Sequence, residues 1–184
     1  MFSKRIIFKN FKNSNNKIRI NKLRRVLKKE LVVSKLLLNS LTDKYKYSFN
    51  KKDLKKFKNF KFYNLIGMGG STLGTEAIYD FLNHKIKKKF KFYNNLRNYP
   101  FLKSNVKKLN LIISKSGNTL ETITNFNLIL KNQNKNKNIF ITENKNNYLV
   151  NLAKKLKSEI IEHKNFIGGR YSVLSEVGML PAEL

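Results

Sequence analysis

The chain has 184 residues, and 39 Lys and Arg against 11 Asp and Glu give it a formal net charge of +28. It contains no cysteine, which excludes disulfides and thiolate metal sites. The cations are spread along the whole sequence instead of forming one stripe, so we expect no specific nucleic-acid partner and no membrane partner. A positive field would still help to collect an anionic substrate.

Residues 1–59 are predicted to form an N-terminal helical and polar segment. Apolar residues recur at three- and four-residue steps, which predicts a helix from about Ile18 to Leu41. A second, short helix is expected near Asp53–Phe57. The longest apolar stretch, residues 31–38, is interrupted by Lys35 and is too short to cross a bilayer. The N-terminus lacks the pattern of a signal peptide, so a cytoplasmic location is expected.

From residue 60 onward the pattern alternates between short apolar runs and helical periodicity. The expected strands are Phe60–Ile66, Phe90–Tyr93, Leu109–Ile113, Asn138–Thr142 and Glu159–Glu162. The expected helices are Thr75–Asn83, a segment around Ile123–Leu130, and Tyr148–Leu156. Such alternation with short connections predicts an α/β fold with a parallel sheet covered by helices. Ligands in these folds bind at the carboxyl ends of the strands.

A hydroxyl-rich loop, Ser114–Thr122, follows the third expected strand. Unpaired backbone N–H groups at the start of a helix attract anions, and Gly117 lets the backbone come close to a ligand. The loop adds several hydroxyl groups and the charge of Lys115, which together suit a phosphate monoester. The alternative is simple helix capping, because Asn118 and Glu121 have the spacing of a capping box.

A glycine-rich loop, Gly67–Gly74, follows the first expected strand. It resembles the start of a dinucleotide-binding fingerprint, but Thr72 stands where the third glycine belongs. Asn94 and Asn95 occupy the place of the acidic residue that binds ribose, so this interpretation is rejected. Ser71 at a helix start would suit a sugar hydroxyl or a phosphate oxygen. A plain strand-to-helix turn explains the loop equally well.

Arg170 is one of few arginines in a chain that otherwise favours lysine. An arginine supplies planar, bidentate and permanently charged donors, so it indicates a site that needs them. The alternative is a structural salt bridge. The residues that follow Ser172 are apolar and helical in pattern, and we expect Val173–Leu180 to lack a partner surface.

The sequence resembles the glucose-6-phosphate isomerase (phosphoglucose isomerase) family in three segments, which occur in the order and spacing seen in that family. They are Gly67–Ser71, Ser114–Thr122 and Gly168–Ser172. The resemblance covers about residues 60–184. It implies an SIS-like three-layer α/β sandwich with a five-stranded parallel sheet, preceded by the N-terminal helical segment. Residues 60–165 would be the sugar-isomerase (SIS) domain, and residues 166–184 the start of a following active-site segment, truncated at Leu184.

The resemblance also implies roles for individual residues. Arg170 matches the arginine that stabilises the enediolate, and Glu121 matches a glutamate near the active centre. The residues that match the family's substrate- and phosphate-binding positions are Gly70, Ser71, Ser114, Lys115 (through its backbone), Ser116, Thr119, Thr122 and Gly169. Met68 and Asn118 depart from the usual residues of these motifs without changing the expectation.

The family's general-base glutamate, its ring-opening histidine and its late lysine have no counterpart before residue 184. The resemblance therefore implies a glucose-6-phosphate isomerase of glycolysis and gluconeogenesis, of which this chain carries the phosphate-binding half and is inactive alone. No cofactor and no metal are expected. The partner is a small sugar phosphate, and the full-length family member would be a homodimer. The alternative is a stand-alone sugar-phosphate-binding SIS domain with a regulatory role.

Overall fold

The computed structural model describes residues 17–33, 40, 42–97, 106–132 and 136–184. The chain divides into two compact units, residues 1–38 and residues 39–184. Helix α1, Lys17–Val33, belongs to the first unit and exposes the apolar side chains of Leu23 and Leu27. Its start agrees with the predicted helix, and residues 34–39 and 41 of that prediction lie outside the described residues.

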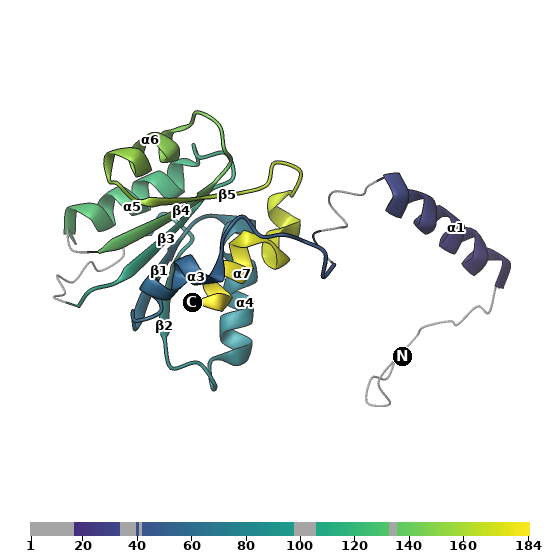
Figure 1. The fold of residues 1–184 in the computed structure, drawn as a ribbon, viewed down its shortest axis with the longest axis horizontal. Coiled ribbons are helices and arrows are strands. Elements are labelled where there is room, and N and C mark those ends of the chain that lie inside the picture. Colours follow the sequence, from purple (N-terminus) through teal and green to yellow (C-terminus); the bar gives the residue numbers. More distant parts are fainter. Residues whose placement is uncertain (1–16, 34–39, 41, 98–105, 133–135) are drawn as a thin grey trace. The chain divides into compact units, whose positions relative to one another are not determined.

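The second unit is built on a five-stranded sheet in which every pair of neighbouring strands is parallel (Figure 1). The strand order is β2-β1-β3-β4-β5. The strands are β1 (Phe62–Ile66), β2 (Lys89–Tyr93), β3 (Leu109–Ile113), β4 (Lys137–Thr142) and β5 (Glu159–Glu162). These bounds confirm the predicted strands to within a few residues, and those of β3 and β5 agree at both ends.

The buried side chains of the strands alternate between two apolar clusters, one on each face of the sheet. Leu109, Leu111 and Ile113 of β3 enter the first cluster, while Ile112 enters the second. This period of two follows from the pleat of a strand. All five residues of β3 are buried, because this central strand is covered on both faces, as in other parallel sheets.

Helices cover both faces and complete a three-layer sandwich (Figure 1). On the second face, α5 (Leu120–Asn132) contributes Phe126 and Ile129, and α6 (Tyr148–Lys155) contributes Leu149 and Ala153. The first face carries four further elements. They are α3 (Lys51–Leu54), the 3-10 helix η1 (Lys55–Phe57), α4 (Leu73–Leu82) and α7 (Glu176–Glu183). The predicted α/β sandwich is therefore confirmed.

The C-terminal residues pack into the core of the sheet. Val177, Leu180 and Leu184 belong to the first apolar cluster, together with Leu54 and Phe57. The expectation that the stretch Val173–Leu180 lacks a partner surface is therefore wrong for its buried members. Val177 and Leu180 are at most 1% exposed, because α7 covers the first face of the sheet beside α3 and η1. The compact unit thus extends on both sides of residues 60–165.

Candidate functional site

The two predicted loops lie next to each other because β1 and β3 are neighbours in the sheet. From β1 the chain crosses to β2 at one side, and from β3 it crosses to β4 at the other. This reversal is the topological switch point of a 2-1-3-4-5 sheet, where ligands of open α/β folds bind. The loop after β1 contains the 3-10 helix η2, Gly69–Ser71, and the loop after β3 is Ser114–Thr119.

Three hydroxyl groups gather in the loop after β3. Ser114 Oγ lies 2.8 Å from Thr119 Oγ1, and Ser116 Oγ lies 3.5 Å from both of these atoms. Ser114 is buried, whereas Ser116 is exposed. The cluster therefore places hydroxyl donors both in the buried part of the loop and at its surface, next to the start of the 13-residue helix α5. Such an arrangement suits an anion with several oxygen atoms.

Gly117 gives this loop its shape. Its φ is +70°, a left-handed conformation that side chains other than glycine rarely adopt. A Cβ atom there would lie 2.1 Å from Cγ of Asn147. Asn147 was not predicted as part of the site. It caps α6 by accepting a bond from the Val150 N–H, and its Nδ2 donates to Thr142 Oγ1. Its place before an amphipathic helix is a capping pattern that could have revealed it.

The predicted capping box is wrong in its register. Helix α5 begins at Leu120, so Thr119 and not Asn118 directly precedes it, and Glu121 is its second residue. Asn118 Oδ1 instead accepts the N–H of Tyr148, the first residue of α6, at 3.0 Å. Asn118 therefore ties the loop to the start of the next helix. Glu121 is half-buried.

Thr122 and Lys115 take different places from the three clustered hydroxyls. Thr122 is fully buried, and within the described residues its Oγ1 has no hydrogen-bond partner. The Lys115 ammonium donates to the carbonyl of Asn165 at 2.7 Å and pairs with Glu143 at 3.6 Å. Bonds from Lys145 and Lys115 hold the Glu143 pKa below its usual value. The Lys115 charge is thus already engaged, which leaves the loop backbone as its contribution to a ligand.

Arg170 lies in the third segment, the 3-10 helix η3 (Gly169–Leu174), which packs directly on η2. A Cβ atom on Gly70 would lie 2.1 Å from the carbonyl oxygen of Gly169, so only glycine permits this approach. Gly70, Gly169 and Arg170 are among the residues that line an apolar groove of about 660 Å³. Arg170 is exposed, and Ser71 is half-buried at the end of η2. The structure therefore brings the first and third predicted segments into contact.

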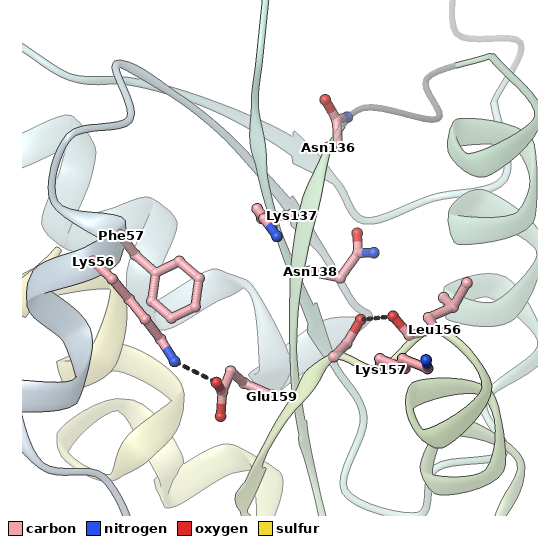
Figure 2. Close-up of a pocket in the computed structure, with 9 residues that line it drawn as sticks. Lys56, Phe57, Asn136, Lys137, Asn138, Leu156, Lys157 and Glu159 are labelled. Atoms are coloured by element: carbon pink, nitrogen blue, oxygen red, sulfur yellow. Dashed lines mark hydrogen bonds and ion pairs between the residues drawn. The ribbon is translucent and has the colours of Figure 1, made fainter.

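A second pocket, of about 280 Å³, lies at the opposite end of the strands, where β4 and β5 begin (Figure 2). It is bordered by Asn136–Asn138 at the start of β4 and by Leu156–Glu159 at the start of β5. Lys56 reaches Glu159 across it, and Ser158 bonds back to the carbonyl of Leu156. Ligands of parallel sheets bind at the carboxyl ends of the strands. This pocket lies at their amino ends, so the fold does not favour it as a ligand site.

Two classes of site find no support in the described part of the chain. No three His, Cys, Asp or Glu side chains there are grouped so that they could hold a metal ion. Likewise, none of the helices described combines the length and the apolar character needed to span a bilayer. The groups that make up the candidate site are hydroxyl groups, backbone N–H groups and Arg170.

Comparison with known proteins identifies the family of this sequence. The family model described as "Phosphoglucose isomerase" matches residues 37–184. The chain belongs to this family. It is 38% identical to glucose-6-phosphate isomerase of Methanocaldococcus jannaschii, over 70% of this chain and 35% of that protein. It is 32% identical to the enzyme of Aster yellows witches'-broom phytoplasma, over 72% and 37%. The chain thus spans about a third of the length of these family members.

Solved structures agree on the fold. A hypothetical protein from Thermus thermophilus has a TM-score of 0.60 and 22% identity, over 87% of this chain and 45% of its own. The tagatose-6-phosphate ketose/aldose isomerase of Escherichia coli has a TM-score of 0.56 and 16% identity, over 85% and 43%. The SIS-like fold that the motifs imply is therefore present in this member of the phosphoglucose isomerase family.

Proposed function

We propose that this chain forms the phosphate-binding part of a glucose-6-phosphate isomerase, which interconverts glucose 6-phosphate and fructose 6-phosphate. The observation that carries the proposal is the cluster of Ser114, Ser116 and Thr119 hydroxyls at the switch point. Its support from the comparisons is that curated relatives at 32% to 38% identity carry this name. The chain spans only 35% of the Methanocaldococcus jannaschii protein, so we propose the complete reaction for the whole enzyme and phosphate binding for this chain.

In this proposal the phosphate of the substrate lies in the loop after β3. The clustered hydroxyls and the N–H groups at the start of α5 donate to its oxygen atoms, as favoured at helix N-termini. The backbone of Lys115 contributes beside them. Thr122 lies in the first turn of α5, three residues after Thr119, and its buried hydroxyl, which has no partner among the described residues, would gain an acceptor.

The sugar then extends toward the loop after β1, where Gly70 and Ser71 lie beside it. Isomerisation removes a proton from C2 of the open-chain aldose and returns a proton to C1, through an enediolate. A general base must carry the proton, and a cation must hold the negative charge that develops on oxygen. Arg170 takes the second role. The base is not assigned to any residue of this chain.

Titration calorimetry with glucose 6-phosphate and with glucose tests the binding step. We expect the phosphate ester to bind at least about tenfold more tightly, because each charge-assisted hydrogen bond contributes roughly 1.5–3 kcal/mol. Ser114→Ala combined with Thr119→Val should abolish this preference. Ser158→Ala is the matched control, because it removes a hydroxyl at the opposite end of the strands. It should leave the preference for the phosphate ester unchanged. Equal affinities for the two sugars would contradict the proposal.

A further inference from the structure

Glu176, the first residue of α7, is completely buried, although it is acidic. A buried carboxylate is costly unless hydrogen bonds compensate for the lost water. The Tyr45 hydroxyl lies 2.9 Å from Glu176 Oε1 and 2.8 Å from Oε2. The backbone N–H of Ser48 donates to Oε1 at 2.9 Å. These partners come from a segment that precedes the sheet, and neither belongs to the candidate site described above.

Residues 45–48, here called the strap, also reach the end of η3. The Tyr47 hydroxyl donates to the carbonyl of Leu174 at 3.4 Å, and its ring meets the ring of Tyr45 edge-on. Burial, together with the bond to Glu176, raises the pKa of Tyr45 far above its usual value. The Tyr45 hydroxyl therefore stays protonated and remains a donor. The strap thus holds both the last residue of η3 and the first residue of α7.

A chain of hydrogen bonds continues from α7 toward Arg170. Ser175 Oγ donates to the carbonyl of Ser172 at 2.7 Å. The single hydroxyl hydrogen of Ser172 is in turn shared between the carbonyl of Gly169, 2.7 Å from Oγ, and the carbonyl of Gly70, at 3.3 Å. The bonds therefore connect the start of α7 with the residue beside Arg170 and with the glycine loop after β1. Since a 3-10 helix has weak internal hydrogen bonds, η3 depends on such anchors for its placement.

We propose that Tyr45 and Glu176 are positioning residues that fix η3, so that Arg170 is held over the substrate. The inference rests on the proposed function, because it assigns Arg170 to a bound sugar phosphate. It adds that the N-terminal strap, which lies outside the three sequence motifs, sets the geometry of the cation. A role in stability alone is the alternative, and the experiment must separate the two.

Tyr45→Phe removes one hydroxyl and keeps the ring. Tyr63→Phe is the matched control, since it removes another hydroxyl bond, to the carbonyl of Phe57 at 3.2 Å, within the apolar core. Calorimetric affinity for glucose 6-phosphate is measured for both variants, with Arg170 present and with Arg170→Ala. We expect Tyr45→Phe to weaken binding about fivefold when Arg170 is present, and to have no further effect with Arg170→Ala. Tyr63→Phe should leave the affinity unchanged.

The inference would be overturned if Tyr45→Phe lost the same affinity with Arg170 present as with Arg170→Ala. It would also be overturned if Tyr63→Phe lost as much affinity as Tyr45→Phe. A second readout does not depend on the substrate. Hydrogen exchange should become at least about fivefold faster in Tyr45→Phe at the amides of Tyr171 and Ser175, whose bonds lie at the two ends of η3, and stay the same at Ile123 in α5. Unchanged exchange in η3 would also overturn it. Glu176→Gln gives the same comparison should Tyr45→Phe fail to fold.

The two readouts also separate this inference from the proposed function. If the unmodified chain shows no affinity for glucose 6-phosphate, the proposed function fails. Exchange at Tyr171 and Ser175 then still decides whether the strap holds η3.

Discussion

The side-chain amide of Asn64 donates to Oδ1 of Asn110 at 2.8 Å in the buried centre of the sheet. Asn110 donates in turn to Oδ1 of Asn138 at 2.8 Å. The three residues are register partners on β1, β3 and β4, so their amides form a ladder across the sheet. A sheet shifted by one residue would leave these amides without partners, and an unpaired buried amide is costly. The ladder therefore specifies the register.

The first prediction concerns this ladder. Asn110→Ala should lower the free energy of unfolding by about 2–4 kcal/mol, because the buried amide of Asn64 and the half-buried amide of Asn138 each lose a partner. Urea denaturation measures the change. Asn151→Ala, at an exposed asparagine of α6, is the control and should cost less than about 0.5 kcal/mol. A similarly small cost at Asn110 would mean that the ladder contributes little.

The second prediction compares three Gly→Ala variants. Gly117→Ala combines a φ of +70° with a steric overlap against Asn147, so it should cost more than about 3 kcal/mol of stability. Gly69→Ala has a φ of +55° but open space, and should cost about 1 kcal/mol. Gly169→Ala has neither obstacle and should be close to neutral. Thermal unfolding of the three chains checks the order, and a neutral Gly117→Ala would contradict it.

The third prediction concerns pH. Burial lowers the pKa of His163 from its ordinary value of 6.5. As the pH falls through 6.5, the unfolded chain therefore takes up the proton before the folded chain does, and stability decreases. The loss continues down to the lowered folded-state pKa. The carboxylates of Glu143 and Glu183 have pKa values lowered from 4.5, so their contributions are lost only at more acidic pH.

Urea denaturation at about pH 7.5 and about pH 5.5 measures this dependence. The unmodified chain should be less stable at the lower pH. His163→Gln should reduce the difference, whereas His84→Gln, at an exposed histidine, should preserve it. An unchanged difference in His163→Gln would show that another group is responsible.

The fourth prediction concerns catalysis. The 184-residue chain alone should show no measurable isomerase activity, because a positioned base typically contributes ~10²–10⁴-fold and none is assigned to it. A coupled assay on the purified chain, beside Arg170→Ala and Glu121→Gln, checks this. Glu121 is the second residue of α5, where a carboxylate serves the helix N-terminus. Robust turnover that Glu121→Gln abolishes would instead make Glu121 the base.

The sequence was sufficient for features that depend on neighbouring residues. The apolar run Leu109–Ile113 marked a buried strand, and glycine with clustered hydroxyls marked the loop after it. The parallel sheet followed from the alternation of such runs with helical segments. These features are local, so that period and turn chemistry reveal them without knowledge of the fold.

Features that depend on distant parts of the chain could not be predicted. Asn118 has the local pattern of a cap for α5, but the fold places it against Tyr148, 30 residues away. The buried Glu176 follows Ser175 like an ordinary first residue of a helix, and nothing nearby indicates that Tyr45 binds it. The asparagine ladder requires the register of β1, β3 and β4, which a single sequence does not contain.

The bond between Tyr45 and Glu176 joins residues that are 131 positions apart. During synthesis at roughly 5–20 residues per second, the ribosome needs on the order of ten seconds to make the residues between them. Throughout that interval the strap is present without its acceptor, while the five strands and the hydroxyl loop are synthesised. The hydroxyl loop after β3 is therefore synthesised before Glu176, through which the strap holds η3.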